Sequence, residues 1–268
     1  TAHAAEPTAP DLLRLAREAL AQRMPDKALA LVEKAIASEP KNPDAHFGKA
    51  HILAAKRDFS GALKSFDRVV ELAPNFSGAY ESRGETHFKI GHIAESINDF
   101  DQFIRLEPSR EPHHWQRGIS YYYAGKFAEG KRQFEIHQKV NPQDVENAVW
   151  HFLCNARLNG VAQARKDLIV IEQDVRVPMK QVHALFAGRG TAKQVLDAVD
   201  AGDATPADRR QRRFFAHLYL GLYFEATGDA KQARAHIEKA VTDFSQDHFM
   251  GDVARVHLQL MNKTKGNN

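Results

Sequence analysis

Four prolines recur at a constant interval along the first half of the chain. The interval is 34 residues each time, and the prolines close the phrases ASEP, ELAP, RLEP and KVNP at Pro40, Pro74, Pro108 and Pro142. Before each proline, apolar residues follow the i, i+3, i+4, i+7 spacing of a helix that buries one face. The proline ring ends that helix because it lacks a backbone N–H and clashes with the preceding turn. A second helical pattern lies upstream of each, so the sequence predicts a helix-turn-helix unit repeated every 34 residues.

The small and aromatic residues inside these units resemble the tetratricopeptide repeat. The consensus positions are occupied by Tyr80, Gly84, Phe100 and Pro108 in the third unit and by Gly118, Tyr121, Gly125, Phe134 and Pro142 in the fourth. Glycine or alanine is needed where two helices touch, with a bulky side chain in the facing hole. The resemblance implies an all-α fold, a right-handed α-solenoid of about five to six helix-turn-helix units.

The repeat pattern weakens after the fourth unit and returns near the C-terminus. Trp150 lies 35 residues after Trp115, so NAVWHFLCNARLNG resembles the first helix of a slipped fifth unit, with 161–171 as its second helix. We therefore expect a disordered or processed tail at 1–8, four regular units at 9–144, a degenerate fifth unit at 145–176, an irregular non-repeat helical hairpin at 177–204, a final unit with a C-terminal capping helix at 205–262, and a disordered tail at 263–268.

Two helix starts in the irregular region carry capping signals. Thr191 and Gln194 have the spacing of a capping box, in which a side chain satisfies otherwise unpaired backbone N–H groups. Thr205, Pro206 and Asp208 place a cap, a first-turn proline and an acid at the start of a longer helix. Helices should therefore begin just after Thr191 and Thr205.

The order of these parts resembles the bacterial "new lipoprotein I" type of tetratricopeptide-repeat adaptor. The resemblance is best over 147–262, in QVHALFAGRGTAKQVLDA and FFAHLYLGLYFEATGDAKQA. It implies an envelope protein, often a dimer, that holds cell-wall enzymes together, so a homodimer is one expected state. The small residues of TAHAAEPTAP also suit a trimmed N-terminus and favour a periplasmic or envelope location, with the cytoplasm as the alternative. The lipid-acceptor cysteine of that family is missing near residue 1.

The composition argues against several classes of chemistry. A formal charge of +3 is small and evenly spread, so nucleic acid is not an expected partner, and no apolar run is long enough for a transmembrane segment. The segment GKFAEGKR resembles a phosphate-binding loop, but Arg132 stands where a magnesium-binding hydroxyl is required. His-Glu-x-x-His, Cys-x-x-Cys and Gly-x-Ser-x-Gly motifs do not occur, so no cofactor, metal site or catalytic residue is expected.

A peptide groove is the remaining candidate site. In tetratricopeptide repeats the first helix of each unit lines the concave face, and the resemblance places partner-binding positions on these helices. They are Arg17, Phe47, His51, Glu81, Glu85, Lys89, Trp115, Gln116, Tyr122, Trp150, His151, Cys154 and Arg157. Aromatic side chains offer large contact area at low entropic cost, which favours a protein or peptide partner. The alternative for each ring is that it packs against the facing helix as ordinary core.

The sequence supports two functional hypotheses. The first is a non-catalytic protein-protein interaction scaffold or adaptor that binds a peptide or protein segment in the concave groove. The second is a thiol- or metal-dependent enzyme or sensor that uses Cys154 and His151, with His51 as a further metal ligand, because the Cys and His share one helical face. A reactive cysteine needs a nearby cation or helix N-terminus, whereas Cys154 lies between Leu153 and Asn155 in mid-helix.

Overall fold

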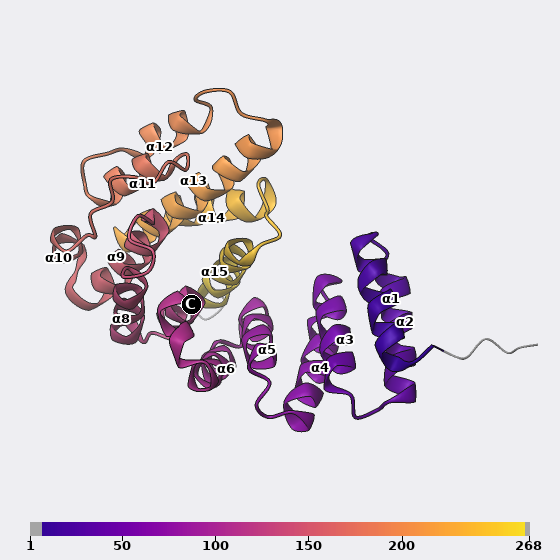
Figure 1. Cartoon of the computed structure of the whole chain (residues 1–268). Helices are drawn as coiled ribbons and strands as arrows, with labels where there is room; N and C mark the ends of the chain where they lie inside the picture. Colours follow the sequence, from indigo (N-terminus) through magenta and orange to yellow (C-terminus); the bar gives the residue numbers. More distant parts are fainter. Residues whose placement is uncertain (1–6, 266–268) are drawn as a thin grey trace, which may run out of the picture. The chain divides into compact units, whose positions relative to one another are not determined.

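The computed structural model describes residues 7–265, and the secondary structure within that range is helical. The chain divides into two compact units, Thr1–Pro108 and Ser109–Asn268, called unit 1 and unit 2 below. This confirms the expected all-α solenoid of helix pairs (Figure 1). Most of the expected N-terminal tail lies outside the described residues. At the other end the last helix continues to Lys265, beyond the expected start of a tail at residue 263.

Unit 1 contains three helix pairs, and in each pair the two helices pack against each other. The helices are α1 (Ala9–Ala21), α2 (Pro25–Ser38), α3 (Pro43–Ala55), α4 (Phe59–Leu72), α5 (Ser77–Lys89) and α6 (Ile93–Leu106). The residues before the first three repeat prolines, Glu39, Ala73 and Glu107, have φ of −132°, −139° and −128°. These values are typical of a residue that precedes proline and cannot stay helical. The prolines therefore end the helices as the sequence predicts.

Each glycine at the helix contact faces a bulky side chain of the paired helix. A methyl group built at Gly84 would lie 2.8 Å from Phe100 Cδ1, and one at Gly118 would lie 2.7 Å from Phe134 Cζ. Both distances are shorter than any carbon contact tolerates, so the helices approach closely only because no Cβ is present. The predicted pairing of small and large residues is confirmed at these positions.

Replacing Gly84 by alanine tests this contact. The added methyl group forces Phe100 or the backbone to move, so Gly84→Ala should lower the free energy of unfolding by about 1–3 kcal/mol. The matched control is Gly48→Ala on α3, where the nearest heavy atom to the new methyl group lies 3.8 Å away. That change should leave stability unchanged or raise it by up to ~1 kcal/mol, because alanine is the better helix former. Chemical denaturation measures both, and equal effects of the two changes would contradict the close-contact argument.

Unit 2 is less regular. Its elements are the 3-10 helix η1 (Pro108–His113), α7 (Trp115–Tyr123), α8 (Phe127–His137), α9 (Val145–Asn159), α10 (Val161–Lys166), α11 (Met179–Phe186), α12 (Ala192–Val199), α13 (Pro206–Ala226), α14 (Ala230–Thr242) and α15 (Phe249–Lys265). The capping boxes predicted at Thr191 and Thr205 are present and start α12 and α13. No described helix is long and apolar enough to cross a membrane.

The expected second helix of the fifth unit is shorter than the sequence indicates. The apolar pattern predicts a helix over 161–171, but α10 ends at Lys166 and the chain then runs without regular structure to Pro178. The run Leu168–Ile171 contains β-branched residues, which lose side-chain freedom in a helix and fit extended backbone better. The helical apolar pattern therefore stops before this run.

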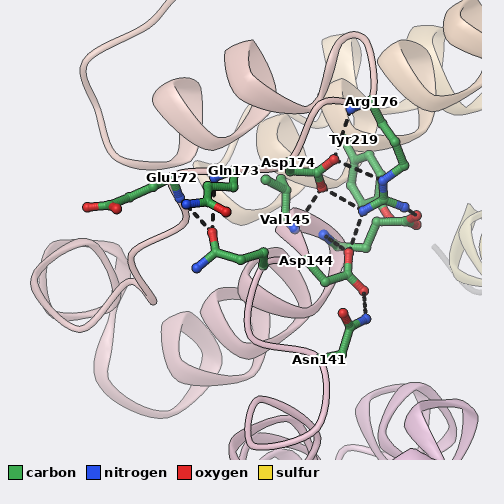
Figure 2. Close-up of polar contacts among 10 residues, drawn as sticks. Asn141, Asp144, Val145, Glu172, Gln173, Asp174, Arg176 and Tyr219 are labelled. Atoms are coloured by element: carbon green, nitrogen blue, oxygen red, sulfur yellow. Dashed lines mark hydrogen bonds and ion pairs between the residues drawn. The ribbon is translucent and has the colours of Figure 1, made fainter.

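Polar contacts hold the extended segment against the start of α9 (Figure 2). Gln143 Oε1 accepts hydrogen bonds from the backbone N–H groups of Glu172 and Gln173, at 2.9 and 3.0 Å. Asp174 accepts a hydrogen bond from Val145 N at 3.1 Å, which satisfies a free N–H group at the helix start. Side-chain and backbone hydrogen bonds thus replace the missing helical turns.

Arg176 is the centre of this cluster. Its guanidinium contacts the carboxylates of Asp144, Glu146 and Asp174 at 2.5, 2.7 and 2.6 Å. Burial alone would raise the pKa of Asp174, but the hydrogen bonds from Arg176 and from Val145 N outweigh it and hold that pKa below its ordinary value. Burial raises the pKa of Glu146, whose carboxylate also accepts a hydrogen bond from Tyr219. The extended segment is therefore fastened by ionised groups.

Removing the Asp174 carboxylate should weaken unit 2 in a pH-dependent way. At neutral pH, Asp174→Asn should cost roughly 1.5–3 kcal/mol, the range for hydrogen bonds to charged groups. The pKa of Asp174 is lowered by folding, so its contribution is present above the unfolded pKa of about 3.9 and is lost as pH falls through the folded pKa. The difference between wild type and variant should therefore shrink in acid. Denaturation curves at pH 7 and pH 3 measure it.

The control for this experiment is Asp197→Asn. Asp197 forms an exposed ion pair with Lys193 at 2.6 Å, and such pairs contribute less than ~1 kcal/mol. A loss for Asp174→Asn no larger than for Asp197→Asn would show that the Arg176 cluster does not fasten the segment.

Candidate peptide-binding site

The predicted residues of unit 1 lie on the first helix of each pair. Phe47 and His51 of α3 are in edge contact, with ring centroids 4.4 Å apart, and His51 Nε2 lies 3.3 Å from Ser82 Oγ of α5. Burial, and then the positive charge of Lys89, lower the pKa of His51. The structure thus brings Phe47, His51 and the α5 face into one surface.

The remaining predicted residues of unit 1 are accessible to different degrees. Glu81, Glu85 and Lys89 are partly exposed and follow an i, i+4 spacing along one side of α5. Arg17 is exposed on α1. A partner can therefore reach these side chains from solvent.

The predicted residues of α9 lie in the interior of unit 2. Trp150, His151 and Cys154 expose only 2%, 4% and 0% of their surface. Helix α9 packs against α7, α8, α10, α11 and α13, so no side of its central turns faces solvent. This corrects the expectation that these three residues line an open groove, and the core alternative holds for Trp150.

The aromatic residues around Trp150 show how this core is built. Tyr122 is 7% exposed, and its ring centroid lies 5.4 Å from that of Trp150. Phe134 stacks on Trp150 at 6.5 Å. Trp115 stays partly exposed but contacts Phe249 of α15 at 5.3 Å, and Gln116 beside it is also partly exposed. The face of α7 that carries Trp115 is therefore partly covered by α15, the C-terminal helix.

Cys154 and His151 do not form a reactive pair. A methyl group built at Gly130 would lie 2.9 Å from Cys154 Sγ, so the thiol fills the gap beside that glycine. Burial raises the pKa of the Cys154 thiol, whereas a nucleophile needs a lowered one. His151 Nε2 lies 3.4 Å from Glu135 rather than beside the thiol. Within residues 7–265, no group of three His, Cys, Asp or Glu side chains could hold a metal.

Alkylation measures the state of Cys154 directly. Because the thiol is buried and its pKa is raised, iodoacetamide at neutral pH should modify the native protein roughly 100-fold or more slowly than a free thiol. The same protein in denaturant should react at the free-thiol rate, which controls for reagent quality. Mass spectrometry follows the reaction. If Cys154 of the native protein is alkylated as fast as a free thiol or faster, the result would support the hypothesis of a reactive thiol.

A cleft of about 720 Å³ lies within unit 2 and contains two of the predicted residues, Tyr122 and Arg157. Its walls come from α7, α8, α9, α13, α14 and α15 and include Tyr123, Phe127, Glu225, Lys231, Arg234, His257, Leu260 and Met261. The volume is in the range of specific ligand sites, and aromatic, aliphatic and charged side chains are all present. We call it the C-terminal cleft.

The Arg157 side chain contacts the aromatic side of the C-terminal cleft. The Arg157 guanidinium lies over the Phe127 ring, 5.0 Å from its centroid. Burial raises the pKa of Tyr122, and the Glu225 carboxylate raises it further, against the opposing charge of Arg157. Tyr122 therefore remains a neutral hydroxyl that can donate or accept a hydrogen bond.

The far side of the cleft carries its charges. His257 Nδ1 shares a hydrogen bond with the Tyr123 hydroxyl at 3.1 Å, and His257 Nε2 lies 3.4 Å from Glu225 Oε2. Burial lowers the pKa of His257 although Glu225 opposes this, so the imidazole is neutral at pH 7. Three cationic side chains, Arg157, Lys231 and Arg234, line the cleft, but Arg234 is ion-paired with Glu238 at 3.1 Å. Arg157 and Lys231 still outnumber the single lining carboxylate, that of Glu225. The cleft is suited to a ligand with negative charge.

The residues that the last repeat contributes to the cleft are not among the positions predicted from the sequence. Glu225 lies four positions after the consensus Gly221, as Tyr122 does after Gly118. The spacing that selects Tyr122 as a groove position on a first helix therefore also selects Glu225. Lys231 and Arg234 belong to a second helix and His257 to the capping helix, where that spacing places no binding positions. Only the packing of unit 2 brings them to the cleft.

Comparison with known proteins agrees with this architecture. Residues 13–75 match the tetratricopeptide repeat family. The chain is 37% identical over 62 residues to cell division cycle protein 27 homolog A of Arabidopsis thaliana, a stretch that makes up 23% of this chain and 9% of that protein. The chain thus spans less than a tenth of the length of this curated relative.

Solved structures extend the likeness to most of the chain. A tetratricopeptide repeat protein from Parabacteroides merdae superimposes with a TM-score of 0.64 at 13% identity, covering 94% of this chain and 98% of that one. PilW, a type IV pilus biogenesis factor, gives 0.54 at 18% identity, with 89% and 95% covered. A MamA fragment from Desulfovibrio magneticus gives 0.55 at 18% identity, with 59% and 89% covered. At these identities the likeness concerns the fold.

Proposed function

We propose that this tetratricopeptide-repeat chain is a non-catalytic scaffold that binds a segment of a protein partner in the C-terminal cleft. The observation that carries the proposal is the convergence of Tyr122, Phe127 and three cationic side chains on one cavity of about 720 Å³. Folds of this type generally serve protein–protein interaction, and aromatic and arginine side chains dominate binding energy in such contacts.

The chemistry of the cleft indicates the kind of segment. Arg157 and Lys231 are exposed and carry positive charge, so they favour an acidic side chain or a terminal carboxylate. Tyr122 and Phe127 on one wall and Leu260 and Met261 on another offer an apolar surface to a neighbouring side chain. An acidic segment with at least one large apolar residue matches both features.

The proposal has two further parts, a contact surface on unit 1 and the cellular setting of the chain. The surface of unit 1 around Phe47, His51 and the α5 face is a second contact region for a protein partner. Action in the bacterial envelope, and pairing of two copies, follow from the resemblance to the lipoprotein-type adaptors. Fractionation of cells and light scattering of the purified chain test these two points, and a cytoplasmic monomer would refute both.

A charge reversal in the cleft tests the main proposal. Peptides selected from a random library on the wild-type chain should be enriched in acidic and large apolar residues. The double variant Arg157→Glu, Lys231→Glu should bind those peptides at least about tenfold more weakly, a loss of ~1.4 kcal/mol or more. Fluorescence anisotropy of labelled peptides measures the affinities.

The matched control reverses two arginines elsewhere in the same unit. Arg209 and Arg210 are exposed at the start of α13 and do not line the C-terminal cleft. Arg209→Glu, Arg210→Glu changes the net charge by the same amount, so long-range attraction is lost equally in both variants. Equal weakening in the two double variants would show that net charge, rather than the cleft, binds the peptides.

A further inference from the structure

The extended segment between α10 and α11 contains four consecutive apolar residues, Leu168–Ile171, and three of them are β-branched. Val170 is 71% exposed and the other three are partly exposed, although residues of this type are usually buried. β-branched side chains fit the pleated surface of a β-sheet, yet residues 7–265 contain no strand that could pair with them. This run, called the apolar stretch below, is therefore a strand-forming sequence without a strand beside it.

The backbone of the apolar stretch has free hydrogen-bonding groups. Among the described residues, no hydrogen bond involves the backbone N–H or C=O of Leu168 or Val170. The carbonyl of Ile169, between them, accepts a hydrogen bond from His183 Nε2 of α11 at 2.8 Å. In extended backbone, the N–H and C=O groups of one residue point to one edge and those of the next residue to the opposite edge. Ile169 thus faces α11, whereas Leu168 and Val170 face away from it.

Contacts at both ends hold the apolar stretch in place. Before it, Asp167 accepts a hydrogen bond from Asn155 Nδ2 at 3.0 Å. After it, the backbone N–H groups of Glu172 and Gln173 donate to Gln143 Oε1 (Figure 2). A segment that is already held in one conformation loses little entropy when a second strand pairs with it. Free edges of this kind are where proteins add a strand from another chain.

The apolar stretch is complementary to itself in an antiparallel register centred on Ile169. In that register, Leu168 of one copy lies opposite Val170 of the other, and the reverse pair lies on the other side of Ile169. Residues that face each other in this way exchange their N–H and C=O groups in hydrogen bonds. The residues that meet are therefore those whose backbone groups are free, and the exposed Val170 side chain is covered by Leu168.

The charges that flank the stretch favour the same register. Lys166 precedes it, Glu172 follows it, and both side chains are exposed. With Ile169 at the centre, Lys166 of each copy comes close to Glu172 of the other, and opposite charges across a strand pair are stabilising. A shift by one residue would instead bring Asp167 opposite Glu172, which places two carboxylates together.

We propose that two copies of this chain associate through the apolar stretch, which forms a two-stranded antiparallel ribbon across a two-fold axis. The proposal rests on the pairing of two copies that is part of the proposed function, and it names the surface that pairs. No residue of the apolar stretch lines the C-terminal cleft, so peptide binding there is independent of it. Because the ribbon is short, the association is weak, with a Kd on the order of 0.1–1 mM.

Two measurements on the unmodified chain test this interface without any variant. Sedimentation equilibrium from about 10 μM to about 1 mM should show a monomer–dimer equilibrium. Over the same range, hydrogen exchange should slow at least about twofold at the amides of Leu168 and Val170, because both N–H groups become bonded. The amide of Ile169 faces α11 and should change less.

A charge exchange tests the register. Lys166→Glu and Glu172→Lys should each weaken the association at least about fivefold, because each places like charges opposite each other at both ends of the ribbon. The variant that carries both changes restores the opposite charges and should return the Kd to within about twofold of wild type. The two single changes alter the net charge in opposite directions, so net charge alone cannot weaken both.

A proline substitution tests the backbone pairing. Val170→Pro removes an N–H group that the ribbon needs, so the Kd should rise at least about tenfold. The matched control is Val175→Pro in the same extended segment, where the side chain is 91% exposed and lies outside the apolar stretch. That change should leave the Kd within about twofold of wild type. The charge exchange leaves the backbone unchanged, so it decides the question if Val170→Pro does not fold.

Two results would overturn the interface, and they differ in what else they refute. A chain that stays monomeric at about 1 mM would show that the apolar stretch is hydrated or covered by a different protein, and would also refute the pairing of copies. A dimer that is unaffected by the charge exchange and by Val170→Pro would refute this interface alone. Peptide binding in the C-terminal cleft is measured separately and stands or falls by its own variants.

Discussion

The close approach of two helices at a glycine is the constraint on which the rest of this structure depends. At Gly84 and Gly118 the backbone of one helix lies against a phenylalanine ring of its partner, and at Gly221 it lies against Ile237. Because there is no room for a Cβ, each of these three pairs has one crossing point and one register. The repeat prolines then fix where the second helix ends, so successive pairs stack at a constant interval.

Unit 2 departs from this regular scheme because α9 is packed on every side. In a simple stack, the first helix of a unit has one face toward solvent. Here α11 and α13 also pack on α9, and its central residues are buried without interruption from Asn147 to Asn155. The extended segment that replaces the end of α10 is fastened by Arg176 and its three carboxylates. The same residues that made α9 look like a binding surface therefore form the interior.

The C-terminal cleft follows from that rearrangement. The C-terminal cleft lies where the last repeat and α15 meet α7 and α9, so its charged residues come from segments that are far apart in the sequence. The cleft requires the C-terminal helix, which contributes His257.

The sequence alone determined the local structure of this protein. Proline spacing gave the helix ends at residues such as Glu39 and Ala73, threonine caps gave the starts of α12 and α13, and the small and large residues gave the pairing of helices, because each depends on neighbours close in the chain. Only the tertiary structure decided which first-helix residues remain accessible. Helical periodicity places Trp150 and Arg157 on similar faces, but burial depends on distant helices that pack there, and these cover Trp150 and leave Arg157 exposed at the C-terminal cleft.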